Sequence, residues 1–357
     1  MSDLMQGFTF PGIRTRVVFG SGTLSRVGEE IEALGRSRAL VLSTPPQADA
    51  AGALAGELGD LSAGKFTEAT MHTPIEVTEA AMEAYKTAGA DCVVSYGGGS
   101  TIGLGKAIAT RTGADHVAIP TTYAGSEMTD ILGETVDGEK TTRRDASIRP
   151  ETVIYDVDTT LTLPVGMTVT SSLNAISHGI EALYAEDRNP ILSQMAVEAM
   201  RVFKRSLHRV TEDPQNRAAR TDVLYGAWLC STALGYVSMA LHHKLAHVIG
   251  GSFGMPHAET HAILLPHTTG FNAAATAELL APVAEIFGGS VGGGLWDFAK
   301  RAGAPLRLRD LGLSEADLDR AAEIATRAPY PNPRPFDRRD IRNLLQAAWE
   351  GARPEGE

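Results

Sequence analysis

Cysteine and basic residues are both scarce in this sequence, and each shortage excludes a class of protein. The two cysteines, Cys92 and Cys230, lie far apart and show no CxxC spacing. They are typical of buried thiols in a reducing compartment, which argues against a disulfide-stapled fold. Lysine and arginine number 32 against 43 aspartates and glutamates, for a formal net charge of −11. Because the basic residues are also scattered, we expect no nucleic-acid partner.

The sequence also shows no targeting signal and no uninterrupted apolar span. Its first ten residues form neither a basic nor an apolar segment, which predicts a cytoplasmic protein. Residues 223–241 carry no formal charge, but glycines and hydroxyl residues interrupt them and no basic cluster flanks them. We therefore expect a helix buried inside a helical domain, and no membrane partner.

Strand-like and helix-like segments alternate over the first 160 of the 357 residues. Short apolar or β-branched runs predict strands at 16–19, 39–42, 64–66, 92–95 and 117–119. Helical patterns lie between them at 22–34 (with Ser21 as its cap), 47–58, 75–88 and 102–109. This order predicts a doubly wound, mostly parallel sheet in an α/β domain. A hairpin with its turn at Asp137-Gly138 is predicted near the end of the domain.

The composition changes after Pro164, where Ala, Leu, Met and Glu dominate and β-branched runs are few. The segments 165–185, 190–210 and 215–241 all have helical character. We therefore predict two domains, an α/β domain over 1–160 and an all-α domain over 161–357.

A glycine-rich turn lies between the strand predicted at 92–95 and the helix predicted at 102–109. Its residues are Gly97, Gly98, Gly99 and Ser100. Glycines there allow the backbone to approach a pyrophosphate, and the helix N-terminus offers free N–H groups and a positive dipole end. The turn is not the GxGxxG of a Rossmann fingerprint, so a tight turn needed only for packing is the alternative.

A second polar segment follows the strand predicted at 117–119. Its Thr121, Thr122 and Ser126 place hydroxyl groups where a diphosphate or ribose binds at the carboxyl edge of a parallel sheet. Ser126 as a helix cap is the alternative interpretation.

Histidine is the most unevenly distributed residue. Six of the ten histidines fall between positions 242 and 267, namely His242, His243, His247, His257, His261 and His267. His243 and His247 are four residues apart, so they share one helix face, and His178 lies four residues after Asn174. A structural role is usual for a single histidine, but this density indicates a site.

These motifs together resemble the group III, iron-containing alcohol dehydrogenases over nearly the whole chain. The resemblance implies a dehydroquinate synthase-like architecture and a GGGS turn that binds the cofactor pyrophosphate. It places the family's metal ligands at Asn174, His178, His243 and His257, and a histidine near the nicotinamide at His247. NAD-preferring members carry an acidic residue after the second strand, where this chain has Ser43 followed by Thr44. NADPH should therefore be tolerated beside NADH, unless Ser43 is only a turn residue.

One departure from the family pattern bears on the metal. Asn174 replaces the family's single anionic ligand, and an amide binds a hard divalent ion less well than a carboxylate does. The metal site is expected to be vestigial. With the runs at 99–106 and 242–247, this substitution is similar to a branch of the family that is regarded as metal-free. That branch reduces the conjugated double bond of maleylacetate, a dicarboxylate, to 3-oxoadipate in the breakdown of aromatic rings.

The roles of the residues follow from this chemistry. Hydride addition to an enone builds negative charge on the ketone oxygen, and an acid must then protonate the neighbouring carbon. We expect His243 and His257 to stabilise the enolate and a carboxylate, with His178 and Asn174 supporting them, and His247 to donate or orient the proton. His261 and His267 match no ligand position and are expected to be structural. Candidates for a cation that binds the second carboxylate are Lys244, Lys140, Arg143 and Arg144.

Three alternatives remain open at this level. The first is a metal-dependent alcohol dehydrogenase in which Asn174 still coordinates iron or zinc. The second is a lyase on the same scaffold, and the third is a non-catalytic nucleotide-binding protein. The resemblance alone also implies a homodimer.

Overall fold

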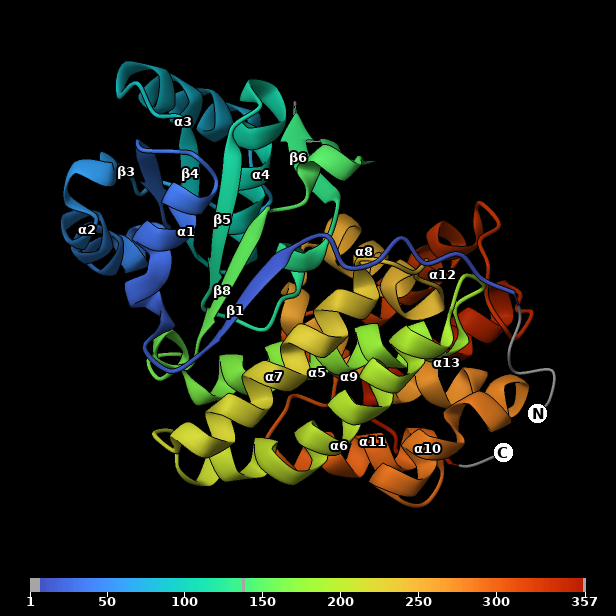
Figure 1. The fold of residues 1–357 in the computed structure, drawn as a ribbon. Helices are drawn as coiled ribbons and strands as arrows, with labels where there is room; N and C mark the ends of the chain where they lie inside the picture. The colour runs from blue at the N-terminus through green and yellow to red at the C-terminus, as the bar shows by residue number, and fades with distance from the viewer. Residues whose placement is uncertain (1–6, 137–138, 356–357) are drawn as a thin grey trace. The chain divides into compact units, whose positions relative to one another are not determined.

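The computed structural model describes residues 7–136 and 139–355, without the side chains of residues 139 and 140. Two compact units divide the chain. One spans Pro11–Leu163 and the other runs from Pro164 onward, together with described residues 7–10. The first is an α/β unit and the second is helical (Figure 1).

A parallel sheet forms the centre of the α/β unit. Its strand order is β1-β8-β5-β4-β2-β3, and every pairing in it is parallel. The strands are β1 (Arg16–Gly20), β2 (Ala39–Leu42), β3 (Ser62–Phe66), β4 (Cys92–Gly97), β5 (Asp115–Pro120) and β8 (Thr152–Asp156). The chain leaves β2 toward β3 on one side and returns to β4 on the other, so the strand order reverses between β2 and β4. Ligands of such sheets bind outside the carboxyl ends of the strands at this switch point.

Helices cover both faces of this sheet, which confirms the doubly wound fold predicted from the sequence (Figure 1). Alternate strand residues enter opposite cores, as the two-residue period of a strand requires. Val41 and Val94 pack against α1 (Val27–Ala33) and α2 (Ala48–Glu57). Leu40 and Val93 pack against the other pair of helices, α3 (Ile75–Thr87) and α4 (Gly99–Thr112).

Two local features of this unit bear on the sequence predictions. The hairpin is present as β6 (Ile131–Val136) and β7 (Glu139–Arg144), paired antiparallel, and its turn at Asp137-Gly138 lies outside the described residues. The predicted cap at Ser21 is wrong. Its hydroxyl donates to Asp158 at 2.6 Å, and the carboxylate of Asp156 accepts the N–H groups of Gly22 and Leu24 instead.

The helical unit follows the composition change at Pro164. Its helices are α5 (Val165–Tyr184), α6 (Pro190–Glu212), α7 (Arg217–Leu234), α8 (Leu241–Phe253), α9 (His257–Asn272), α10 (Ala277–Phe287), α11 (Val291–Arg301), α12 (Leu318–Thr326) and α13 (Arg338–Glu350). The helix α5 packs against α6, α7 and α9, and α8 packs against α9 and α12. Apolar side chains of α8, α9, α12 and α13 share one core. Two helices that carry histidines, α8 and α9, are thus fixed from several sides.

Two apolar stretches of this unit are long enough to be considered for a membrane. The uncharged run at 223–241 is not one helix, because α7 ends at Leu234 and α8 begins at Leu241. Ala274–Arg301 is long and apolar enough to be considered for a span, and less than half of its most apolar part is buried. Gly288 and Gly289, both with positive φ, separate α10 from α11 inside it. Each of these two helices is too short to cross a bilayer, which takes about 20 helical residues.

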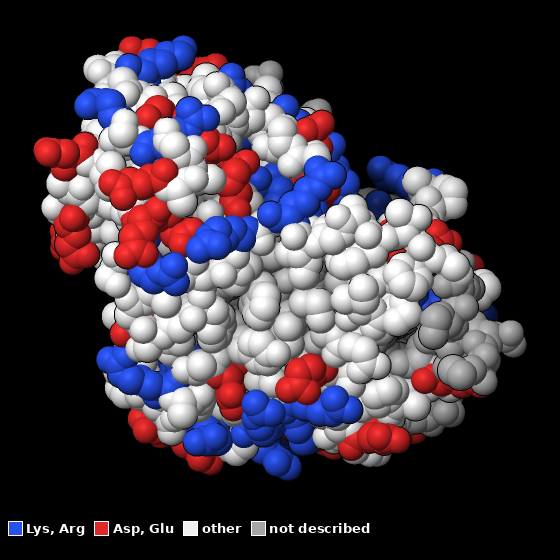
Figure 2. Space-filling view, in the orientation of Figure 1, with Lys and Arg blue, Asp and Glu red and all other residues white. Residues whose placement is uncertain are grey.

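Charged side chains of both signs lie next to one another in the upper left and along the lower edge of the face drawn in Figure 2, with a broad uncharged area between them. In the α/β unit many are paired, as Arg36 with Asp115 and Arg111 with Glu134. Acidic partners thus offset the charge of these arginines, and the sequence as a whole has fewer basic than acidic residues.

Candidate active site

The glycine turn lies at the switch point of the sheet, between the end of β4 and the start of α4. Gly98 is the N-cap of α4 and offers no side-chain acceptor to its first N–H groups. A Cβ added at Gly98 would lie 3.0 Å from Oγ1 of Thr122, and one at Gly97 would collide with Thr101. No side chain of Gly97 or Gly98 therefore covers the backbone at the N-terminus of α4, an arrangement that suits a cofactor diphosphate.

The hydroxyl residues that follow β2 and β5 are joined at this edge by Gln47. Its Nε2 donates to Oγ1 of Thr121 at 3.0 Å, and its Oε1 lies 3.4 Å from Oγ1 of Thr44. Ser43 is fully buried, and its Oγ has no hydrogen-bond partner among the described residues. Thr44, which is half-buried, is thus the more accessible residue at the end of β2.

A buried lysine fixes the segment that contains Ser126. Lys106 on α4 is fully buried, and its Nζ donates to Thr129 Oγ1 at 2.8 Å and to the carbonyls of Ser126 and Ile131. Burial lowers the pKa of Lys106 to about 7, against the opposing attraction of the nearby carboxylates Glu127 and Asp130. Ser126 therefore belongs to a rigid segment, with its hydroxyl 3.3 Å from the ammonium group.

Three polar residues of the helical unit lie along α5 at helical spacing. Asn174, His178 and Glu181 are 2%, 3% and 1% exposed. Neither Oδ1 of Asn174 nor Nδ1 of His178 has a hydrogen-bond partner among the described residues. By contrast, the carboxylate of Glu181 accepts hydrogen bonds from two backbone N–H groups and from His243. The same helix thus presents two unpaired polar atoms and one fully engaged carboxylate.

The helix α8 contributes three further histidines. His243 has its Nδ1 2.6 Å from Oε2 of Glu181, while its Nε2 is buried without a partner among the described residues. The ring centroids of His243 and His178 are 5.0 Å apart. His242 is buried and directs its Nδ1 to Oγ1 of Thr268 at 2.9 Å, whereas His247 is exposed.

The helix α9 contributes His257 at its first residue and His261 one turn later. His257 is exposed and His261 is fully buried, and their ring centroids are 4.4 Å apart. The His261 ring also lies 5.1 Å from that of His243, centroid to centroid. The structure therefore brings His178, His243, His247 and His257 into one cluster of rings with His242 and His261, and we call these six residues the imidazole cluster.

Burial keeps the inner members of this cluster neutral. Desolvation, reinforced by neighbouring histidines, lowers the pKa of His178, His242 and His261 well below 6.5. His267 lies elsewhere on α9, and burial lowers its pKa to about 4. Near pH 7 the inner rings therefore act as neutral hydrogen-bonding groups, each able to donate one N–H and accept at the other nitrogen.

The iron implied by the family resemblance can be tested against these side chains. Among the described residues, no three His, Cys, Asp or Glu side chains are placed to hold a metal ion together. Asn174 brings a neutral amide, and the nearby carboxylate of Glu181 is already engaged by hydrogen bonds. Imidazole suits iron, but the amide of Asn174 brings no charge, so these side chains fit a divalent ion less well than a set with a carboxylate ligand does.

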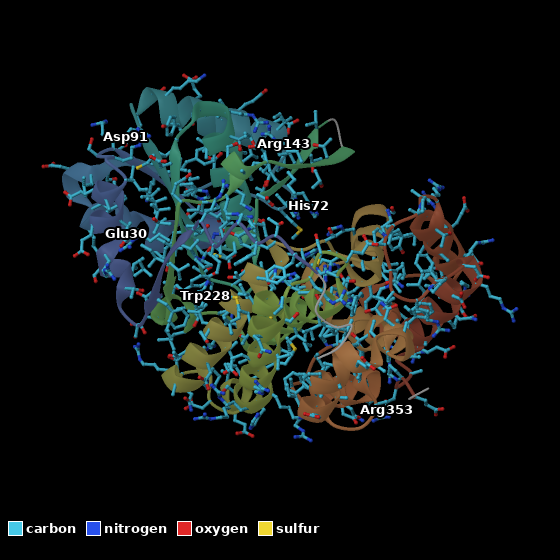
Figure 3. The ribbon with its side chains drawn as sticks, turned by 45° about the vertical axis from the view of Figure 1, so that its right-hand side comes forward. Glu30, His72, Asp91, Arg143, Trp228 and Arg353 are labelled. Carbon is cyan, nitrogen blue, oxygen red and sulfur yellow. The ribbon has the colours of Figure 1, made fainter. Side chains whose placement is uncertain are left out.

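The cation candidates are distributed over both units. Lys244 follows His243 on α8, and its Nζ lies 5.8 Å from the ring centroid of Tyr330. Arg143 belongs to β7 of the α/β unit (Figure 3) and reaches Glu134 only at 3.8 Å. Arg144 pairs with Asp130, and the side chain of Lys140 lies outside the described residues. Lys244 is the candidate that shares an element with the imidazole cluster.

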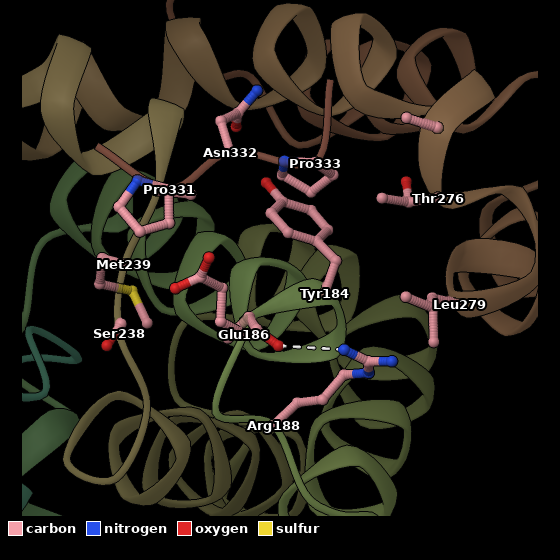
Figure 4. A pocket seen from close by; sticks show the side chains of 13 residues that line it. Tyr184, Glu186, Arg188, Ser238, Met239, Thr276, Leu279, Pro331, Asn332 and Pro333 are labelled. Atoms are coloured by element: carbon pink, nitrogen blue, oxygen red, sulfur yellow. Dashed lines mark hydrogen bonds between the residues drawn. The ribbon is translucent and has the colours of Figure 1, made fainter. Parts of the chain in front are cut away.

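A cavity of about 510 Å³ lies in the helical unit, with Tyr184 and Asn332 among its lining residues (Figure 4). Its lining includes Ala240, whose N–H donates to Glu181, and Tyr184, which follows Glu181 by three residues on α5. Asn272 donates to the hydroxyl of Tyr184 and exchanges hydrogen bonds with Asn332. Ala240 and Tyr184 therefore connect the wall of this cavity to Glu181 on α5.

Sequence reasoning missed Glu181, Gln47 and Lys106. The signal for Glu181 was present, because it lies three residues after His178 and so on the same side of the helix. Gln47 and Lys106 carried no comparable signal. Both act through hydroxyl or carbonyl groups that only the sheet topology brings close.

Comparison with known proteins gives concordant results. A model described as iron-containing alcohol dehydrogenase matches residues 14–157, and one described as the C-terminal part of the Fe-containing alcohol dehydrogenase family matches residues 168–349. Maleylacetate reductase of Rhizobium sp. (strain MTP-10005) is 58% identical over 351 residues, covering 98% of this chain and 100% of that protein.

Solved structures agree with these matches. The crystal structure of maleylacetate reductase from Agrobacterium tumefaciens is 58% identical, with a TM-score of 0.96 over 98% of this chain and 100% of that one. Sulfoacetaldehyde reductase from Bifidobacterium kashiwanohense, in complex with NAD+, is 21% identical with a TM-score of 0.86, covering 96% of this chain and 99% of that chain. The second comparison concerns the fold alone.

Proposed function

This chain belongs to the iron-containing alcohol dehydrogenase family, and we propose that within it the chain is the NAD(P)H-dependent oxidoreductase that reduces maleylacetate to 3-oxoadipate. The observation that carries the proposal is the imidazole cluster. Curated relatives and a solved structure that match over nearly the full length are maleylacetate reductases, and the cluster gives this chain the hydrogen-bonding groups that such a reduction needs.

The α/β unit supplies the cofactor site in this proposal. Gly97, Gly98 and the N-terminus of α4 bind the diphosphate, and Thr121 and Thr122 bind adjacent oxygens of the dinucleotide. Gln47 orients the Thr121 hydroxyl. The bound NADH or NADPH supplies the hydride.

The helical unit supplies the groups that manage the developing charge. Maleylacetate is a dicarboxylate whose double bond is conjugated to a ketone, so hydride addition places negative charge on the ketone oxygen. We assign stabilisation of that oxygen and of a carboxylate to His243 and His257. Asn174 donates its amide N–H to the substrate or to His178. His247, exposed and next to both rings, donates the proton to carbon.

We also assign the binding of the second substrate carboxylate to Lys244. It is half-buried and adjoins His243 in sequence. Burial of the Tyr330 hydroxyl, whose ring lies 5.8 Å from the ammonium group, raises its pKa, so this tyrosine stays neutral and does not offset the lysine charge. An ammonium group in such a position attracts a dianionic substrate.

The reaction in this proposal proceeds without a metal ion. The support is the neutral Asn174 and the engagement of Glu181 by backbone and His243. Hydrogen bonds from imidazoles then replace the Lewis acid that a metal-dependent relative would use. The competing function is a metal-dependent alcohol dehydrogenase, and a chelator separates the two.

The proposal includes a cytoplasmic homodimer with neither a nucleic-acid nor a membrane partner. The acidic net charge supports the absence of a nucleic-acid partner. Large apolar side chains such as Met167 and Ile191 are about half exposed on the helical unit, which supports a protein contact there. Light scattering on the purified protein tests the dimer, with a mass near twice that of one chain as the expected result.

The activity itself is tested by following NADH and NADPH oxidation with maleylacetate and, in parallel, with simple aldehydes and alcohols. We expect rapid oxidation with maleylacetate, 3-oxoadipate as the product, and little turnover of the simple substrates. Turnover of alcohols alone would support the metal-dependent alternative. Conversion without net NADH consumption would support a lyase.

A further inference from the structure

A single carboxylate joins the start of α8 to the ring of His243. Oε1 of Glu181 accepts the N–H of His242 at 2.8 Å, and Oε2 accepts the N–H of Ala240 at 3.0 Å. The same Oε2 lies 2.6 Å from Nδ1 of His243. Glu181 itself is 1% exposed. One buried anion thus has three partners on an element 59 to 62 residues further along the chain.

The two backbone contacts replace a missing helix cap. Ala240 is the N-cap residue of α8 and has no side chain that could accept a hydrogen bond. The first N–H groups of a helix need acceptors, and an anion is favourable at the positive end of the helix dipole. Glu181 satisfies both needs from α5. The start of α8, directly before His243, is therefore held by this carboxylate.

The third contact fixes the orientation and the tautomer of His243. A carboxylate oxygen can only accept a hydrogen bond, so Nδ1 of His243 must carry the hydrogen. The ring is consequently held with Nε2 directed away from Glu181, and this Nε2 is buried without a partner among the described residues. Leaving a polar atom in that condition is unfavourable for stability. The arrangement keeps Nε2 available for a ligand.

We propose that Glu181 is a positioning residue for the reduction, which holds the start of α8 and the His243 ring so that Nε2 of His243 meets the substrate oxygen. Nε2 donates to that oxygen when both ring nitrogens carry a hydrogen, a form in which Nδ1–H still donates to Glu181. The inference rests on the proposed function, in which His243 touches substrate. A helix cap alone would need only the two backbone contacts. Oε2 of Glu181 accepts from both Ala240 and His243, so a single atom holds the start of α8 and the ring together.

Two further residues of the helical unit, Tyr184 and Asn272, support this assignment. Tyr184 lies three residues further along α5, and burial together with the charge of Glu181 raises the pKa of its hydroxyl well above the usual value. Asn272 on α9 donates its Nδ2 to that hydroxyl at 3.4 Å. Glu181 thus lies near a buried hydroxyl that α9 also contacts, and at 1% exposure its side chain has little room to follow a displaced ring.

The test uses Glu181→Gln, which keeps the shape but removes the charge and one acceptor oxygen. We expect kcat with maleylacetate to fall about 10- to 100-fold, as is typical when a group that orients a functional histidine is lost. KM for maleylacetate and for NADH should change less than about threefold, because the interaction acts through His243 in the transition state. Unchanged kcat in a folded Glu181→Gln protein would overturn the proposal.

A double-mutant cycle shows whether Glu181 acts through His243. In a His243→Asn background, adding Glu181→Gln should change kcat less than about twofold, because the ring to be positioned is gone. Independent, multiplying losses would instead show that Glu181 acts on something other than His243, and would also overturn the assignment.

Two control variants separate positioning from general destabilisation. Glu30→Gln alters another buried carboxylate, 2% exposed on α1 and paired with Arg16 and Arg26 (Figure 3). Val248→Ala creates a cavity under α8 without touching Glu181. Both should lower the melting temperature and leave kcat unchanged. A loss of kcat in either control equal to that of Glu181→Gln would assign the effect to stability.

A spectroscopic measurement on the wild-type protein is independent of turnover. In wild-type protein labelled with ¹⁵N-histidine, multiple-bond ¹H–¹⁵N correlations identify the protonated nitrogen of each ring, and His243→Asn assigns the signal. We expect a hydrogen on Nδ1 of His243, and a signal that shifts or broadens in Glu181→Gln. A hydrogen on Nε2 alone would refute the positioning contact. If the wild type failed to reduce maleylacetate, the proposed function would fall while this measurement still decided the contact.

Discussion

Nε2 of His242 lies 2.8 Å from Nδ1 of His261, which joins α8 to α9 through two buried imidazoles. Thr268 donates its hydroxyl hydrogen to the carbonyl of Leu264, so its oxygen accepts the Nδ1–H of His242 at 2.9 Å. His242 then accepts from His261, whose Nε2 is left as a buried acceptor without a partner among the described residues. This chain of contacts makes His261 part of the imidazole cluster, although its place in the sequence suggested a structural role.

Replacing Thr268 tests this chain through stability. Thr268→Val keeps the shape but leaves Nδ1 of His242 buried and unsatisfied, which should lower the free energy of unfolding by about 1–3 kcal/mol. Thr269→Val is the matched control, because the Thr269 hydroxyl is also buried but bonds only to Leu265 of its own helix. Its cost should be smaller. Urea denaturation measures both, and equal costs would contradict the chain.

The dependence of stability on pH follows from the buried histidines, namely His178, His242 and His261 of the cluster and two outside it. Burial lowers the pKa of His116 to about 3 and that of His267 to about 4. Between pH 6.5 and 4 the unfolded chain binds protons that the folded chain does not, so stability falls as the pH falls, by up to about 1.4 kcal/mol per unit for each histidine. Denaturation from pH 7.5 to 4.5 checks this slope. His267→Gln should reduce it by about one proton, and an unchanged slope would show that His267 is not buried.

Much of the α/β unit was predictable because its signals are local. The run Ala39–Leu42 is wholly apolar and bounded by polar residues, and the structure has the strand at those residues. The glycine turn at 97–100 marked the strand-to-helix junction correctly. By contrast, the end of α7 at Leu234 lies inside an uncharged run, so no change of polarity marked it. Local patterns determine where elements form but not every boundary.

The contacts that complete the site are long-range, and this is why the sequence did not reveal them. Glu181 accepts hydrogen bonds from residues about sixty positions away. Ser21, predicted to cap a helix, instead donates its hydroxyl hydrogen to Asp158, 137 positions away. Similarly, the burial of Ser43 depends on β2 lying between β3 and β4 in the sheet. The histidines were found because their density and spacing are local features. Their partners depend on how helices pack.

The metal question has a direct test in Asn174. We expect wild-type activity to persist in EDTA and the protein to bind substoichiometric metal by elemental analysis. Asn174→Asp places a carboxylate at a buried position, so Zn²⁺ or Fe²⁺ should raise the melting temperature of the variant and leave that of the wild type unchanged. The new anion should also lower turnover of a dianionic substrate. Loss of wild-type activity in EDTA, restored by Fe²⁺, would establish a metal enzyme.

Cofactor preference should be set at the end of β2, and Thr44 is the position to change. Ser43→Asp would bury a charge, since Ser43 is fully enclosed, and should destabilise the fold. Thr44→Asp places the carboxylate at a half-buried position, where it should repel a 2′-phosphate. We expect kcat/KM to fall with NADPH and to change little with NADH. Gly98→Val is the control that weakens both cofactors, because its side chain would contact Thr122 at the diphosphate position. An equal effect of Thr44→Asp on both cofactors would place the ribose elsewhere.

The assignment of His243 is tested by comparison with His267, which lies on α9 and is also buried. If Nε2 of His243 stabilises the developing enolate, His243→Asn should lower kcat about 10²- to 10³-fold, the usual cost of removing one such donor. KM should change less, because the interaction strengthens in the transition state. His267→Asn should retain kcat, although burial makes it costly for stability. His257→Ala should resemble His243→Asn, since its ring lies at the accessible end of the cluster.

Steady-state kinetics with NADH binding measured separately would distinguish the possible outcomes. A raised KM at unchanged kcat would make His243 a carboxylate anchor that binds substrate and transition state alike. A folded His267 variant as inactive as His243→Asn would remove the imidazole cluster from the mechanism.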